Sequence, residues 1–317
     1  MEPLIRDTII YVNLLVLINV GITLTYMTSR VPNFAQGTFV AVGIYTSFTT
    51  AEILKANVYF AAPLSFLLGG AASYLMYRLV IGPQIRRNAS VTALIMTTIA
   101  IDVLFIGILN IYADYAQYVW KILSRQFLLR EFDFQLAGEP GVFFVAPGLV
   151  MTLVIVLHTS LNRTKFGTAM RAAVVNPALA SVLGINVQLV YAVSWFVAGG
   201  LAGVAGSLFS LWFQGSTDAP FSLVVSAFSA SILGGIFSIY GAFLGGYIIG
   251  LSETLGTILL ADVVGMWIIG YRTGIPLAIM VLTLLLIPTG IASIDLRGAF
   301  RKKLGRGRTP GYADSGL

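Results

Sequence analysis

The stretch RTKFGTAMRAAVVNPALASVLGI, residues 163–185, decides how the chain is interpreted, because it is patterned for structure yet too polar to cross a membrane. Asn176 followed by Pro177 is typical of a helix N-cap with proline in the first turn, and Gly184 supplies the left-handed residue that ends a helix. Another short helix is predicted over 168–174, because Ala, Met and Arg are good helix formers. It should end before Pro177, since a proline disfavours helical conformation at the residue that precedes it. Helices shorter than about 12 residues are marginal alone in water, so this pair must dock against another structure.

The composition is that of an integral membrane protein. Hydrophobic residues make up 57% of the 317 residues and charged residues 10%, whereas a soluble domain carries about 25% charged residues. Apolar runs recur along the whole chain without a polar linker, so we expect a single transmembrane domain over 1–317. The first run starts near Thr8 and has no small-residue cleavage site, so we expect it to be kept as a span.

Nine apolar segments are long enough, or nearly so, to cross a bilayer, which takes about 20 residues. They lie at 8–28, 35–54, 58–80, 91–112, 142–160, 187–212, 221–233, 241–260 and 274–288. The seventh is short and rich in Ser, so it is either half-buried or re-entrant. We therefore predict an all-α polytopic membrane protein with nine transmembrane helices, and eight or ten remain open alternatives.

The loop charges predict the orientation, because cytoplasmic loops carry an excess of Lys and Arg. With nine spans and the amino terminus outside, the basic clusters and the carboxyl terminus all fall in the cytoplasm. The clusters are Arg30; Arg78, Arg86 and Arg87; Arg163, Lys165 and Arg171; and a basic tail, about 292–317, with Arg297, Arg301, Lys302, Lys303, Arg306 and Arg308. The acidic residues that fall outside are Asp114, Glu131, Asp133, Glu139, Asp218 and Asp262. The net charge of +6 is thus explained by topology and the lipid bilayer, and we expect no nucleic-acid partner.

Small residues and buried carboxylates mark the interior of the bundle. Glycines recur at short spacing in the sixth and eighth spans, at Gly199, Gly200, Gly203, Gly206, Gly241, Gly245, Gly246 and Gly250. Packing drives helix association in lipid, so we expect these spans at the centre. Asp102 and Glu253 are predicted at membrane depth, where a charge costs about 3 kcal/mol or more, so each should face a partner or a wet cavity.

Catalytic and metal-binding motifs are missing from the sequence. The chain has no Cys and one His, which excludes a disulfide framework and a thiolate or histidine metal cluster. No phosphate-binding loop, nucleophile elbow or zinc-protease motif occurs. We therefore expect a protein that is not an enzyme and that has no means of hydrolysing ATP.

Four motifs, in the same order along the chain, resemble the permease subunits of branched-chain amino acid ABC importers of the LIV type. NFAQG at 33–37 is similar to the family's Asn-Phe-Ala-x-Gly segment, with Gln36 where many members carry His. The stretch 167–185 resembles the family's cytoplasmic loop. The glycine motifs over 233–253 and PTGI at 288–291 resemble its carboxyl half.

The resemblance implies a subunit that works in a complex within the plasma membrane of a prokaryote. It would pair with a second related permease, rest on two ABC ATPase subunits that bind the ATP, and receive substrate from an extracytoplasmic solute-binding protein. It would need no cofactor of its own. The loop 163–185 would couple to the ATPase through Gly167, Arg171, Ala172, Ala173, Asn176, Pro177 and Gly184. The chain lacks the Glu of the related EAA motif, which favours a contact through Arg171.

The expected function is therefore the permease of an ATP-driven importer for amino acids, with branched-chain amino acids as the expected substrate. An ABC permease for urea or short amides and an ion-coupled secondary carrier remain alternatives, although carriers tend to show internal repeats, which we do not find. The residues expected to form the translocation path or its packing are Asn33, Gln36, Gly37, Gly199, Gly203, Gly206, Ser226, Gly234, Gly235 and Glu253.

Overall fold

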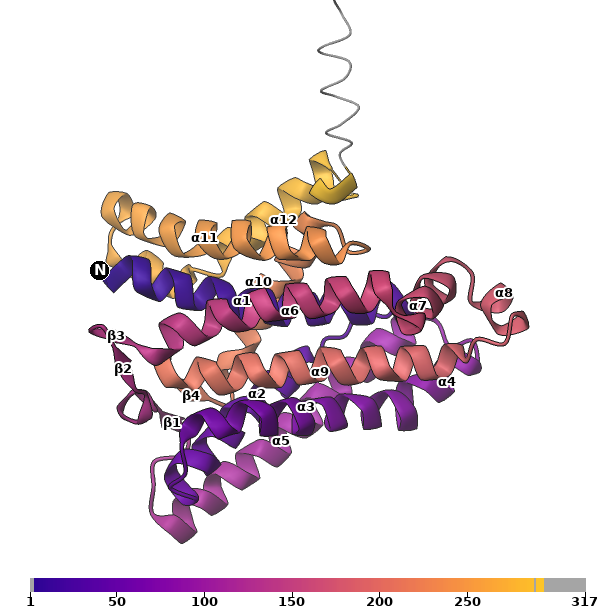
Figure 1. The fold of residues 1–317 in the computed structure, drawn as a ribbon. Coiled ribbons are helices and arrows are strands. Elements are labelled where there is room, and N and C mark those ends of the chain that lie inside the picture. The colour runs from indigo at the N-terminus through magenta and orange to yellow at the C-terminus, as the bar shows by residue number, and fades with distance from the viewer. Residues whose placement is uncertain (1–2, 288, 294–317) are drawn as a thin grey trace, which may run out of the picture.

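The computed structural model describes residues 3–287 and 289–293, which form a bundle of helices (Figure 1). The long helices are α1 (Pro3–Ser29), α5 (Val91–Trp120), α6 (Gly141–Arg163), α9 (Val187–Trp212) and α11 (Ile239–Val264). The shorter ones are α2 (Gln36–Phe48), α3 (Ala61–Met76), α4 (Gly82–Arg86), α7 (Lys165–Val175), α8 (Pro177–Val182), α10 (Ala219–Gly234) and α12 (Gly274–Leu286). The predicted all-α class is confirmed for the described residues.

Single π or 3₁₀ turns extend several of these helices. The π turns are η1 (Thr49–Ile53) after α2 and η3 (Tyr77–Ile81) between α3 and α4. The 3₁₀ turns are η2 (Val58–Phe60), η4 (Arg130–Phe132), η5 (Met266–Tyr271) and η6 (Ile291–Ser293). Because η2, α3, η3 and α4 run on without a break, they form one apolar helix over Val58–Arg86.

Six helices of the described chain are long and apolar enough to cross a membrane, so the protein is a multi-pass membrane protein. They are α1, the continuous helix Val58–Arg86, α5, α6, α9 and α11. They correspond to six of the predicted spans, and α5 continues beyond the predicted 91–112 to Trp120. The other predicted spans correspond to the shorter helices α2 with η1, α10 and α12. The count of nine crossings stays a prediction, and Pro288 and the tail from 294 lie outside the described residues.

Helices α1 and α9 form the core of the bundle. Within their apolar windows 94% of residues in α1 and 78% in α9 are buried inside the protein. Glycines let α9 approach both of its neighbours: an added Cβ at Gly203 would overlap the carbonyl oxygen of Ser65 in α3, and one at Gly43 in α2 would overlap the carbonyl oxygen of Gly203. The predicted central place of the glycine-rich sixth span is confirmed, because only small side chains permit this approach. The same prediction for the eighth span is wrong: only 28% of the apolar window of α11 is buried, because its glycines pack one face of the helix against α1 and α10.

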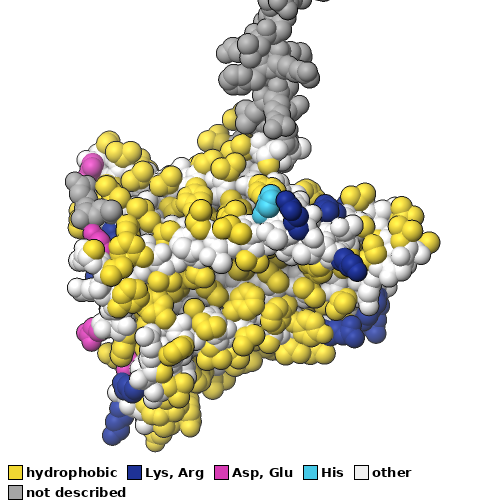
Figure 2. Space-filling view, viewed as in Figure 1, with side chains coloured by type: hydrophobic (Ala, Val, Ile, Leu, Met, Phe, Trp, Pro, Cys, Tyr) yellow, Lys and Arg dark blue, Asp and Glu magenta, His cyan; other side chains and the backbone are white. Residues whose placement is uncertain are grey.

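The two ends of the bundle differ (Figure 1). At one end, called here the α8 end, α7 and α8 project beyond the other helices. At the opposite end, four two-residue strands tie the loops together: β1 (Gln126–Phe127) pairs antiparallel with β4 (Gly215–Ser216), and β2 (Gln135–Leu136) with β3 (Glu139–Pro140). Figure 2 shows Lys and Arg side chains at both ends, whereas the visible Asp and Glu side chains lie only at the end opposite α8.

Helix α5 is held less tightly than the others. Only 11% of its apolar window is buried. Polar contacts tie it to α2 and to the chain before α10. Asp102 accepts a 2.5 Å hydrogen bond from the Thr38 hydroxyl, and Asn110 accepts one of 3.1 Å from Thr217. Because α5 leaves most of its apolar face uncovered, this face is available for lipid or for another subunit.

Candidate functional site

The loop at the α8 end has the local structure that its sequence predicts. Asn176 is extended, its side chain accepts a 3.0 Å hydrogen bond from the Leu179 N–H, and Pro177 opens α8. Gly184 takes the left-handed conformation with φ of 81°. Helix α7 is longer than the predicted 168–174, because Thr164 caps it by accepting a 3.1 Å hydrogen bond from the Gly167 N–H.

Two of the predicted coupling residues join α7 to α6. The guanidinium of Arg171 donates to the carbonyl oxygen of Leu161, and to the Thr168 hydroxyl at 3.4 Å. Leu161 lies in the last turn of α6, where carbonyl groups lack partners within the helix. A Cβ at Gly167 would overlap the same carbonyl oxygen. These contacts fix the angle between α6 and α7, and they place Arg171 in contact with its own chain.

The loop exposes large apolar side chains, and of its alanines only Ala178 is exposed. Ala173 and Ala180 are buried against the rest of the chain, and Ala172 is half-buried. The side chains that project are Val175, Leu179, Val182 and Leu183, which are exposed by 81%, 57%, 82% and 71%. We call these four residues the apolar tip. Sequence reasoning missed them, although Leu179, Val182 and Leu183 recur at the three- and four-residue spacing of one face of α8.

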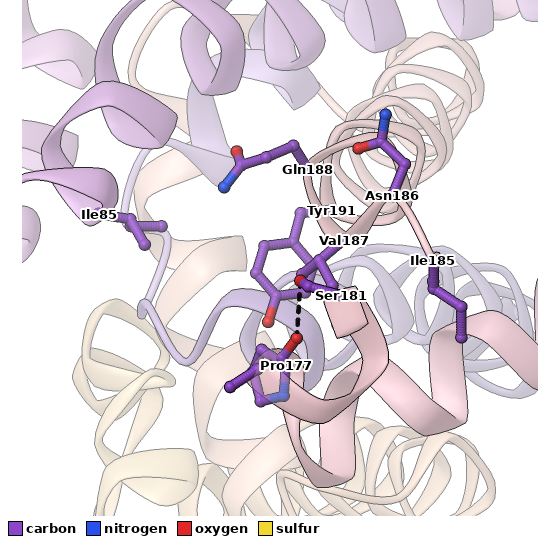
Figure 3. A pocket seen from close by; sticks show the side chains of 9 residues that line it. Ile85, Pro177, Ser181, Ile185, Asn186, Val187, Gln188 and Tyr191 are labelled. Carbon is purple, nitrogen blue, oxygen red and sulfur yellow. Dashed lines mark hydrogen bonds between the residues drawn. The ribbon is translucent and has the colours of Figure 1, made fainter. Parts of the chain in front are cut away.

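A groove of about 540 Å³ lies behind the apolar tip (Figure 3). Figure 3 shows side chains from three elements around it: Ile85 of α4, Ser181 of α8 and Tyr191 of α9. The Ser181 hydroxyl donates a 2.9 Å hydrogen bond to the Pro177 carbonyl oxygen, and Gln188 accepts one of 2.9 Å from the Tyr77 hydroxyl. The projecting helix therefore leaves a hollow beside the bundle.

Most residues predicted for the path lie at buried contacts between helices. The Gln36 amide donates a 3.0 Å hydrogen bond to the Ala198 carbonyl oxygen in α9 and accepts one of 3.2 Å from Asn33. Like Gly203, the glycines Gly199 and Gly206 lie where α9 crosses α3 and α2. This set therefore packs α9 against α2 and α3.

The remaining predicted residues lie on α10 and α11. A Cβ at Gly234 would overlap the backbone of Gly241 in α11, and Gly235 has a φ of 107° that favours glycine. Ser226 is buried, and its hydroxyl donates a 3.2 Å hydrogen bond to the Ser222 carbonyl oxygen. The structure thus places Gly234 and Gly235 at the turn that closes α10 against α11.

Glu253 lies in a buried charged cluster with residues from two other elements. Its side chain is 1% exposed, and it accepts hydrogen bonds of 2.9 Å from the Tyr11 hydroxyl and 2.8 Å from Nε of Arg272. The Arg272 guanidinium also lies 4.5 Å from the centre of the Tyr11 ring. The predicted need of Glu253 for a partner is confirmed. Sequence reasoning missed Arg272, because it lies between two apolar segments and no pattern links it to α11.

A cavity of about 740 Å³ lies between α2, α5, α10 and α12, and we call it the α5 cavity. Two of the segments predicted to form the path reach it, through Phe34 and Gly37 before and within α2 and through Phe228 and Ile232 of α10. The third predicted segment, 199–206, does not line it. Asp102 is the carboxylate of α5 that faces this cavity, as expected for a charge at membrane depth.

The end opposite α8 carries paired charges around Trp212. The Arg6 and Arg130 guanidinium groups lie 4.6 and 3.6 Å from the centre of the Trp212 ring. Nearby, Asp133 accepts hydrogen bonds of 2.5 Å from the Tyr59 hydroxyl and 3.2 Å from the Val142 N–H. Burial raises the pKa of the Asp133 carboxyl above its usual range. These contacts hold the loops at this end in place.

Six helices that are long and apolar enough to cross a membrane, within the part of the chain that the structure describes, define a multi-pass membrane protein. The chain belongs to the family of permease components of branched-chain amino acid transport systems, whose sequence model matches residues 4–291. The predicted resemblance to this family is confirmed.

Similar proteins carry the same description. The chain is 40% identical to the probable branched-chain amino acid transport permease protein LivH of Methanocaldococcus jannaschii, over 93% of each chain. It is 27% identical to the high-affinity branched-chain amino acid transport system permease protein LivH of Salmonella typhimurium, and also to BraD of Pseudomonas aeruginosa, over 87% of this chain and 90% of each relative. The solved structure of PsaBC from Streptococcus pneumoniae in complex with Fab has a TM-score of 0.51 and 12% identity, with 94% of this chain and 96% of that chain covered. This last similarity concerns the fold alone.

Proposed function

We propose that the chain is the transmembrane permease subunit of an ATP-driven importer of branched-chain amino acids. The observation that carries the proposal is the family match over residues 4–291, together with a relative of 40% identity named for this transport. The chain would form the translocation path as one transmembrane domain. It would have no cofactor of its own, because partner subunits would bind the ATP.

The proposed orientation places the α8 end in the cytoplasm. Figure 2 shows Lys and Arg side chains but no visible Asp or Glu side chain towards this end, and an excess of Lys and Arg marks cytoplasmic loops. The amino terminus would then be outside and the carboxyl terminus inside after nine crossings. Three of these crossings would use the short helices α2 with η1, α10 and α12, which other helices shield in part from lipid.

The partners follow from the ends and faces of the bundle. The apolar tip and the loop 163–185 would dock on the ATPase subunits, since an exposed apolar patch rimmed by polar residues is typical of a protein interface. The uncovered face of α5 would pack against the second permease. The loops around Trp212, at the end opposite α8, would receive the solute-binding protein.

Reconstitution tests this proposal. The chain should copurify with an ATPase that carries a phosphate-binding loop and with a second permease. The complex in liposomes, supplied with its solute-binding protein, should take up leucine, isoleucine or valine only with ATP. Transport by the purified chain alone under an ion gradient would favour the secondary carrier instead, and ATP-driven uptake of urea in place of leucine would favour the short-amide permease.

Replacing apolar side chains of the apolar tip with charged ones should uncouple ATPase activity from the arrival of substrate. We expect Val182→Asp with Leu183→Asp to lower substrate-stimulated ATPase activity of the complex at least about tenfold, because two buried apolar anchors at an interface are worth about 2 kcal/mol or more. Val182 is 82% exposed, so folding should be unaffected. The matched control is Val263→Asp, an equally exposed valine at 84% near the end of α11. If the double variant and Val263→Asp have the same substrate-stimulated ATPase activity, the apolar tip takes no part in coupling.

A further inference from the structure

The α5 cavity has the size and lining of a small-molecule site. Its volume of about 740 Å³ falls within the range of roughly 300–1,000 Å³ found for ligand pockets. One wall is aromatic, since Phe34 and Phe228 stack with ring centres 4.9 Å apart and planes 25° apart. Aliphatic side chains of α5, α10 and α12 form much of the remainder, among them Ile99, Val224 and Met280. The cavity therefore suits a ligand with an aliphatic body.

The ionisable side chains that line this cavity are acidic. Asp102 and Asp218 line it, and among the described residues no Lys or Arg does so. One oxygen of Asp102 accepts the 2.5 Å hydrogen bond from Thr38, the third residue of α2. Thr38 lies in the first turn of α2, and the N-terminus of a helix stabilises negative charge. A ligand with a positive group would be attracted, and an anion would be repelled.

The carboxylates of Asp102 and Asp218 lie at different heights along α5. Asp102, Ile106 and Asn110 follow one face of α5 at intervals of four residues, and Asn110 pairs with Thr217, the neighbour of Asp218. Eight residues of helix span about 12 Å. A positively charged group entering beside Asp218 would therefore meet a second carboxylate about two turns deeper in the membrane. An acyl chain of a lipid would gain nothing from either carboxylate.

We propose that the α5 cavity is the transit site for the solute, with the ammonium group of an aliphatic α-amino acid on Asp102 and its branched side chain against Phe34 and Phe228. This inference rests on the proposed function. The ligand carboxylate meets no fixed cation among the residues that line the cavity, so binding is weak. Weak binding suits a transport path, because a solute held tightly would not be released.

Leucine uptake by the reconstituted complex tests the site. Asp102→Asn should lower uptake at least about tenfold, since a charge-assisted hydrogen bond is lost, while ATPase stimulation by the loaded binding protein persists. The amide oxygen still accepts the bond from Thr38, so thermal unfolding should not change. Val225→Trp, which fills the cavity, should also block uptake. The control is Asp114→Asn, the same change at an exposed carboxylate of α5, which should leave uptake unchanged.

Two amphiphiles probe the ligand chemistry in the wild-type complex. 3-Methylbutylamine keeps the branched chain and the ammonium group and should slow leucine uptake, whereas 4-methylpentanoate lacks the ammonium group and should not. Wild-type uptake in both Asp102→Asn and Val225→Trp would overturn the inference and leave the proposed function intact. Dissociation of the complex in these variants would instead show that lipid or another subunit occupies the cavity. That result would also overturn the inference. If the wild-type complex takes up no amino acid, the proposed function itself is wrong.

Discussion

Gly203→Leu should prevent the protein from folding into a stable bundle. The backbone of α9 meets α3 on one side and α2 on the other at this residue, and a Cβ would overlap the carbonyl oxygen of Ser65. Backbone atoms cannot move aside as a flexible side chain can, so the three helices would have to separate. Overpacking costs about 1–3 kcal/mol in ordinary cores, and we expect at least the upper value. The measurement is the unfolding temperature of the purified protein in detergent, with the yield of monodisperse protein as a second readout.

Gly107→Leu is the matched control for this change. Gly107 is also a helical glycine in a long apolar helix, but an added Cβ there has no heavy atom within 4 Å. The substitution should raise the helix propensity by about 0.8 kcal/mol and should leave the unfolding temperature unchanged or slightly higher. If both variants unfold at the same temperature, the close approach of α2, α3 and α9 does not limit stability.

Local features were predictable from the sequence because neighbouring residues determine them. Asn176, Pro177 and Gly184 bound α8 through contacts within a few residues, and the structure confirms each. The central place of α9 followed from its glycines, because small side chains have one principal use inside a lipid bilayer. The family itself followed from short motifs that occur in a fixed order.

Contacts between distant segments were not predictable in the same way. Glu253 was expected to have a partner, but nothing in the sequence selects Arg272, which belongs to a turn between two apolar segments. Glycine gave an ambiguous signal as well: Gly203 packs helices, whereas Gly37 lines the α5 cavity. The side that a short helix buries is set by the surface on which it docks. This explains why Ala173 faces inward and Val182 projects.

Arg272→Met should destabilise the protein through the charge that it leaves behind. Glu253 is 1% exposed and cannot be solvated once the 2.8 Å contact with Arg272 is lost. Removing one partner of a buried ion pair costs about 3–5 kcal/mol. We expect about 3 kcal/mol, the lower end, because the Arg272 side chain is itself 37% exposed. The control is Arg125→Met, which breaks an ion pair with Asp114 whose side chains are 59% and 54% exposed; a surface pair contributes about 0–1 kcal/mol.

The double variant tests whether the unpaired Glu253 side chain causes the destabilisation expected for Arg272→Met. Arg272→Met combined with Glu253→Gln removes both charges, while the amide oxygen still accepts the hydrogen bond from Tyr11. It should therefore be more stable than Arg272→Met alone, and the coupling energy from the double-mutant cycle should be about 2 kcal/mol. Denaturant unfolding of the four proteins in the same detergent gives this value. A coupling energy near zero would mean that the contact between Glu253 and Arg272 does not stabilise the fold, and that the Tyr11 hydroxyl rather than Arg272 holds α11 against α1.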